Sequence, residues 1–135
     1  MATIKSFTDF QQSKKLAEIL SHDSADMWFV NGIVIARNSI NEPEDIKSVF
    51  PCWSLAALLN LLPNEIITDN RFECHYQIHI RKYDGGDNTT LYQIAYGNDR
   101  GSSGSWHDMI NTGEKESLID CCVQMIIRLK EMNLL

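Results

Sequence analysis

One stretch of alternating residues constrains this fold more than any other part of the sequence. Apolar Phe72, Cys74, Tyr76, Ile78 and Ile80 alternate with polar Glu73, His75, Gln77, His79 and Arg81. A period of two places the two sets on opposite faces of a β-strand. A turn-forming sequence follows at 84–88, and a second alternating run carries Tyr92, Ile94 and Tyr96. The stretch 72–96 therefore predicts an antiparallel hairpin, and other segments must cover its apolar face because a lone hairpin is unstable in water.

Helices are predicted in three segments of the sequence. Residues 8–21 begin with Thr8 as the expected N-cap and Gln11 as its capping-box partner. Residues 54–62 place leucines at i, i+3, i+4 and i+7 and end before Pro63. Residues 117–132 begin at Ser117 as N-cap and carry apolar side chains along one face. We expect all of them to pack on one face of a sheet.

The remaining strand signals complete an α+β pattern. Residues 27–36 are rich in Trp, Phe, Val and Ile, which favours a strand. Asn31-Gly32 in their middle is consistent with either a tight hairpin turn or a bulge within one strand. Residues 106–110 predict a short edge strand. The element order predicts an α+β fold with one antiparallel sheet of three to four strands, in a single domain spanning 1–135.

Charge and composition bear on partners and setting. The net charge is −6 and the twelve Lys and Arg residues are scattered, so we expect no nucleic-acid partner. No run approaches the roughly 18 apolar residues of a membrane helix, and no apolar signal region follows the N-terminus, so we expect a cytoplasmic protein and no membrane partner. Cys52, Cys74, Cys121 and Cys122 lack the spacing of a secreted disulfide framework, which predicts reduced thiols.

Three sequence blocks resemble a family of small prophage and mobile-element proteins of gut bacteria. The first block is QSKKLAEIL at 12–20 with SADM at 24–27, the second is WSLAALL at 53–59 before a proline, and the third is IDCCVQMI at 119–126. The resemblance spans most of the chain in the right order. It implies a cytosolic bacterial setting and a phage-type origin, and it brings no activity, cofactor or catalytic residue.

A metal site and a catalytic thiol are the chemical candidates that the sequence offers. His75 and His79 would share a metal ion if they lay on a helix, but on a strand they are roughly 13 Å apart. Cys74 would point to the opposite face. Cys52 precedes a predicted helix, whose dipole would lower the thiol pKa, yet no base can be assigned to it. We therefore expect no metal or cofactor and name no catalytic residue.

Two surfaces remain as functional candidates. The polar face of the hairpin is the candidate recognition surface, consisting of His75, Gln77, His79, Arg81, Gln93 and Trp106. Val123 and Ile127 form a second apolar strip on the last helix, which is a candidate oligomer contact. The pattern favours a non-enzymatic, phage-type accessory protein that acts through protein contacts or self-association. The alternative is a small-ligand binder or enzyme with a site near His75, His79 and Trp106.

Overall fold

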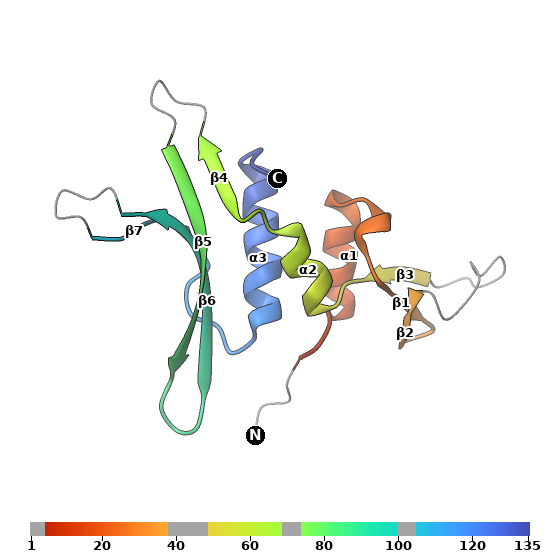
Figure 1. Ribbon diagram of the computed structural model, residues 1–135. Coiled ribbons are helices and arrows are strands. Elements are labelled where there is room, and N and C mark those ends of the chain that lie inside the picture. Colours follow the sequence, from red (N-terminus) through yellow and green to blue (C-terminus); the bar gives the residue numbers. More distant parts are fainter. Residues whose placement is uncertain (1–4, 38–48, 69–73, 100–104) are drawn as a thin grey trace.

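Figure 1 shows the computed structural model, in which residues 5–37, 49–68, 74–99 and 105–135 are described. The elements in chain order are α1 (Phe10–Ile19), the 3-10 turn η1 (His22–Ser24), β1 (Met27–Val30), β2 (Ile33–Ala36), β3 (Val49–Cys52), α2 (Leu55–Leu61), β4 (Glu65–Thr68), β5 (Cys74–Asp84), β6 (Thr90–Asn98), β7 (His107–Asn111) and α3 (Leu118–Glu131). Every strand pairing is antiparallel. The α+β class that the sequence predicts is confirmed.

The strands form two sheets, where the sequence led us to expect one. One sheet has the order β2-β1-β3 and the other has the order β4-β5-β6-β7. The helices lie between them, with α3 against β6 and α1 in contact with both α3 and β3 (Figure 1). Phe10 on α1 makes edge-to-face contacts with Phe29 and Phe50 of the smaller sheet. These ring contacts pack the smaller sheet against α1.

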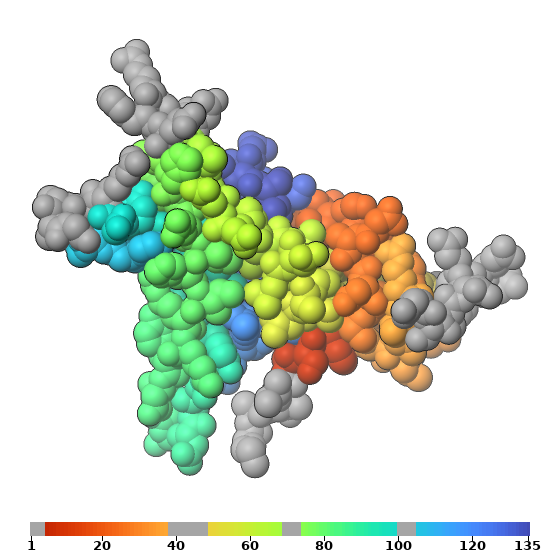
Figure 2. Space-filling model, in the orientation of Figure 1, coloured from red at the N-terminus to blue at the C-terminus, as the bar shows by residue number. Residues whose placement is uncertain are grey.

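The central hairpin forms as predicted, with β5 and β6 paired from Gln77 and Gly97 to Asp84 and Thr90. Ile94 and Tyr96 are fully buried on the helix side. Ile80 shares that side but is 48% exposed, because the end of the hairpin projects beyond the helices (Figure 2). Phe72 and Glu73 lie outside the described residues.

The Asn31-Gly32 pair forms a hairpin turn. Both residues have positive φ angles, of 50° and 83°, and Val30 pairs directly with Ile33 across them. Two consecutive positive φ angles define the two-residue turn that matches the twist of the flanking strands. The bulge interpretation is therefore wrong.

The predicted N-cap is confirmed at the last helix and is wrong at the first. Ser117 caps α3 as expected, and Ser54, at which no cap was predicted, caps α2. At α1 the N-cap is Asp9, whose carboxylate accepts from the Gln12 backbone N–H at 2.8 Å. Cap and capping-box partner are therefore each one position later than the predicted Thr8 and Gln11. Thr8 is instead fully buried, with its hydroxyl 2.7 Å from that of Ser13. Burial of Thr8 leaves the exposed aspartate to cap the helix.

Strands β3 and β4 were not predicted, and β7 corresponds to the expected edge strand at 106–110. Within the described part of the chain, no helix is both long and apolar enough to span a bilayer.

Candidate recognition surface

The outer face of the larger sheet carries the odd-numbered side chains of β5. Across β5 and β6, His79 lies opposite Ala95 and Arg81 opposite Gln93. The even-numbered residues, such as Tyr76 and Ile78, pack against the core on the other side. All described helices lie on that inner side (Figure 1). The predicted recognition residues therefore share a face that no described helix covers.

Trp106 is the centre of this face. Its ring stacks on the His79 ring with centroids 3.6 Å apart and planes 14° from parallel. Its indole N–H donates to Asp108 Oδ1 at 2.7 Å. A stacked ring and a bonded N–H together hold the indole in one orientation.

Gly97 provides the space in which Trp106 lies. A Cβ atom at this position would lie 2.9 Å from the Trp106 ring and 2.2 Å from the carbonyl oxygen of His107. The β6–β7 register also shifts between Tyr96 and Gly97. A bulge next to a glycine re-aims the side chains of the paired strand. The close approach of β7 and Trp106 to β6 thus depends on the missing side chain.

Arg81 on β5 and Asp108 on β7 form an ion pair across β6 on this face. The guanidinium donates to both carboxylate oxygens, at 2.7 and 2.8 Å, in a bidentate pair. These hydrogen bonds lower the pKa of Asp108 and raise the pKa of Arg81. Gln93 Oε1 accepts from Arg81 at 3.0 Å and from the Tyr83 hydroxyl at 3.1 Å. The resulting network, which we call the Trp106 cluster, comprises His79, Arg81, Tyr83, Gln93, Trp106 and Asp108.

His75 and Gln77 belong to the same face but lie towards β4. His75 Nδ1 is 2.5 Å from Glu65 Oε1, and Gln77 pairs in register with Glu65. Beside His75, Ile67 is 53% exposed. The structure thus brings His79, Arg81, Gln93 and Trp106 together and places His75 and Gln77 at one side of them.

Sequence reasoning missed Asp108, Tyr83 and Gly97 as members of this site. Tyr83 continues the odd-numbered alternation of β5, so its position was readable from the sequence. Asp108 was in the predicted edge strand, but its partner on β5 lies two strands away. The role of Gly97 depends on tertiary contact and has no local signal.

A shallow groove of about 660 Å³ runs between α1 and α3 and includes both residues of the predicted oligomer contact. Val123 is only 5% exposed, and Ile127 packs half-buried against the core. The strip therefore contributes mainly to the packing of the chain itself and leaves little apolar surface for a second subunit.

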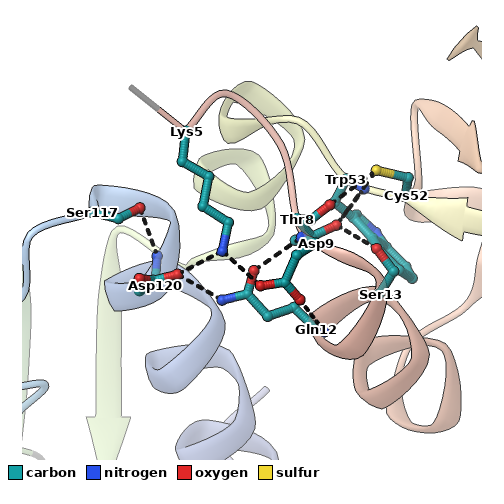
Figure 3. A network of polar contacts seen from close by, with 9 residues as sticks. All are labelled: Lys5, Thr8, Asp9, Gln12, Ser13, Cys52, Trp53, Ser117 and Asp120. Carbon is teal, nitrogen blue, oxygen red and sulfur yellow. Dashed lines mark hydrogen bonds and ion pairs between the residues drawn. The ribbon is translucent and has the colours of Figure 1, made fainter. Parts of the chain in front are cut away.

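The charges at one end of this groove are already paired (Figure 3). Lys5 Nζ lies 2.9 Å from Asp9 Oδ2 and 2.9 Å from Asp120 Oδ1, and Gln12 Nε2 donates to the same Asp120 oxygen at 2.7 Å. Burial acts to lower the pKa of Lys5, but the two carboxylates outweigh it and raise the pKa. This network joins the first turns of α1 and α3 and is structural.

Cys52 lies in a buried polar cluster with Thr8 and Ser13 (Figure 3). Its thiol donates to the Thr8 carbonyl oxygen at 3.5 Å. Burial raises the pKa of Cys52, which is opposite to the lowering that a helix dipole would cause. Burial likewise raises the pKa of Cys122 to about 12. All four cysteines are free thiols, and Cys74 is the one that is not buried.

Within the described ranges, no three His, Cys, Asp or Glu side chains are grouped so that they could hold a metal ion. His75 and His79 lie on a strand, where four residues span roughly 13 Å. Comparison of the chain with protein-family models, with curated proteins and with solved structures finds no match.

Proposed function

We propose that the chain is a non-enzymatic accessory protein that binds another protein through the outer face of the larger sheet. Trp106, His79 and Arg81 would make the main contacts. The observation that carries the proposal is the fixed Trp106 side chain on a face that none of the described helices covers. Trp and Arg contribute disproportionately to the free energy of protein–protein binding. Side chains that are already held in one rotamer lose less entropy when a partner binds.

A small-ligand or enzyme site near His75, His79 and Trp106 is supported less well. Catalysis needs an acid, base or nucleophile that faces a bound substrate. Asp108 instead accepts from Arg81 and Trp106, and its pKa is lowered, so it is a poor proton donor near neutral pH. His75 is bonded to Glu65, on the β4 side of the face. This arrangement favours a contact surface.

The sequence resemblance adds a setting to this proposal. The blocks at 12–27, 53–59 and 119–126 imply a phage-type protein of the bacterial cytosol. An acidic chain with scattered Lys and Arg residues is suited to a protein partner better than to nucleic acid. We therefore expect the partner to be a cytosolic bacterial or phage protein.

Purification of the tagged chain from its native host, followed by mass spectrometry, tests the proposal. We expect a specific co-purifying protein whose recovery falls at least tenfold with Trp106→Ala and several-fold with His79→Ala. His79 is exposed, so its replacement should leave the fold intact and should separate loss of contact from loss of structure.

Trp28→Ala is the matched control, because it removes the same side chain from the smaller sheet. Equal recovery of the partner with Trp28→Ala supports the assignment to the Trp106 cluster. Loss of the partner with Trp28→Ala, together with full recovery with His79→Ala and Trp106→Ala, would overturn it.

A further inference from the structure

The sheet edges of this protein differ in how they are protected. Exposed strand edges pair readily with other strands, and soluble proteins usually block them with charge, proline, bulges or covering segments. At the β3 edge, Pro51 lacks an N–H and Thr8 pairs with Trp53 just beyond the strand. The β4 edge carries Glu65, and β7 carries Asp108 and a register shift.

The β2 edge has none of these protections among the described residues. Its sequence is Ile33-Val34-Ile35-Ala36, without charge or proline. Ile33 is 66% exposed, which is the highest exposed fraction among the exposed large apolar residues of the described chain. A short apolar strand with a free edge is the standard site for addition of another strand.

The backbone register shows which groups of β2 are available. The Val30–Ile33 pair flanks the two-residue turn, and the Arg37 N–H donates to the Asp26 carbonyl at 3.0 Å. Hydrogen bonding alternates along an antiparallel strand, so the odd-numbered residues bond to β1. The N–H and C=O groups of Val34 and Ala36 therefore point away from the sheet.

The side chains next to this edge form an apolar face. Register places the following residues on the side of the sheet away from α1: Trp28, Val30, Ile33, Ile35, Val49 and Pro51. None of them is charged, although the chain as a whole carries a net charge of −6. Among the described residues, β2 itself carries no carboxylate on either face. Just beyond its end, the Arg37 guanidinium lies over the Trp28 ring and pairs with Asp23.

We propose that β2 pairs antiparallel with β2 of a second copy about a twofold axis. With Ile35 opposite Ile35, Val34 of each copy faces Ala36 of the other, so the outward backbone groups bond to each other. Residues of equal parity face each other in this register, so the apolar faces of the two small sheets become continuous. Such an interface is self-complementary, as twofold symmetry requires. A foreign partner would be expected to need charged or polar side chains for selectivity, and β2 offers none.

The short strand length sets the strength of this association. A pairing of four-residue strands buries much less than the roughly 1,200–2,000 Å² of a stable interface, so we expect a dissociation constant on the order of 100 µM. Association should therefore be measured by sedimentation velocity of the full chain at concentrations from about 10 µM to 1 mM. The weight-average mass should rise towards that of a dimer.

Two variants address the register directly. Ile33→Lys places a cation opposite Arg37 of the other copy, and Val34→Pro removes an outward N–H without touching the β1–β2 bonds. We expect each to weaken association at least tenfold. Ile80→Lys is the matched control, because Ile80 is 48% exposed on β5, and it should associate as the wild type does.

Amide hydrogen exchange of the wild type gives a second measurement that needs no variant. Val34 and Ala36 amides should gain protection as concentration rises, while the outward Ile67 amide of β4 should not. A monomeric mass up to 1 mM, or association that Ile33→Lys and Val34→Pro leave unchanged, would overturn the proposal.

Discussion

The outer faces of the two sheets differ in polarity. The larger sheet presents the Trp106 cluster, in which Arg81, Asp108, Gln93 and the indole N–H bond to one another. The smaller sheet presents aliphatic residues and Trp28, with Arg37 over the Trp28 ring at 5.1 Å. A polar network with paired charges resists non-specific association, whereas an apolar face next to an open strand edge invites it.

Under our two proposals, the two sheets serve different contacts. On the larger sheet, selectivity would come from the fixed geometry of hydrogen-bonding and aromatic groups. On the smaller sheet, backbone pairing would supply most of the specificity, because its side chains differ little from one another. A chain that pairs through β2 would also present two Trp106 clusters, and two linked sites increase the apparent affinity for a repeated partner.

Gly97→Ala should have the largest effect, and it tests whether the larger sheet depends on close packing. The added methyl would collide with the His107 carbonyl oxygen and the Trp106 ring, so β7 must move. We expect a loss of about 3 kcal/mol in the free energy of unfolding, measured by urea denaturation, because overpacking at backbone contacts is costly.

Gly32→Ala is the comparison in the smaller sheet. Nothing lies within 4 Å of a Cβ at Gly32, but its φ of 83° is strained for alanine. We expect a cost of about 1 kcal/mol there. A cost at Gly97 no greater than that at Gly32 would show that β7 adjusts freely, and the Trp106 cluster would then not be rigidly held.

Asp108→Asn should have the next largest effect and tests the ion pair on the larger sheet. The Asp108 and Arg81 side chains are 20% and 24% exposed, and the variant keeps the shape while removing the negative charge. We expect a loss of about 1–2 kcal/mol at pH 7, typical of a charge-assisted hydrogen bond.

The control is to measure the free energy of unfolding of the wild type and of Asp108→Asn as a function of pH. The folded-state pKa of Asp108 is lowered, chiefly by the hydrogen bonds from Arg81, so its stabilisation is fully present above the unfolded pKa of about 3.9. It is lost as pH falls through the folded pKa. The difference in the free energy of unfolding between the wild type and Asp108→Asn should therefore be constant above about pH 5 and should shrink below pH 4. An advantage that persists unchanged in acid would mean that the carboxylate charge is not its source.

The features that the sequence predicted correctly are those with a local pattern. The β5–β6 hairpin follows from strict alternation, and the cap Ser117 follows from residue type next to an apolar run. At α1, Thr8 and Asp9 are adjacent and both can cap. Only tertiary burial of Thr8 beside Ser13 decides between them, and no sequence pattern reports it.

The features that were missed depend on partners far along the chain. β3 has four residues, one of them Pro51, and pairs with β1, which begins 22 positions earlier at Met27. The split into two sheets arises because α1 and α3 lie between them, and no local signal encodes that placement. Asp108 joins the candidate recognition surface through Arg81, which lies two strands away.

Ile33→Lys should have the smallest effect on the stability of the monomer, measured at a few micromolar where association is negligible. The side chain is 66% exposed, so little apolar area is lost when it is replaced. We expect a change within about 0.5 kcal/mol, as at other surface positions.

Ile66→Lys in the β4 edge strand is the contrasting variant, because Ile66 is only 3% exposed and a buried cation should destabilise the fold severely. If Ile33→Lys proved as costly as Ile66→Lys, Ile33 would be packed within the single chain, and its apolar character would need no second copy to explain it. A neutral result would show that Ile33 is not needed for folding of the monomer, so its apolar side chain would be available for the β2–β2 contact that we propose.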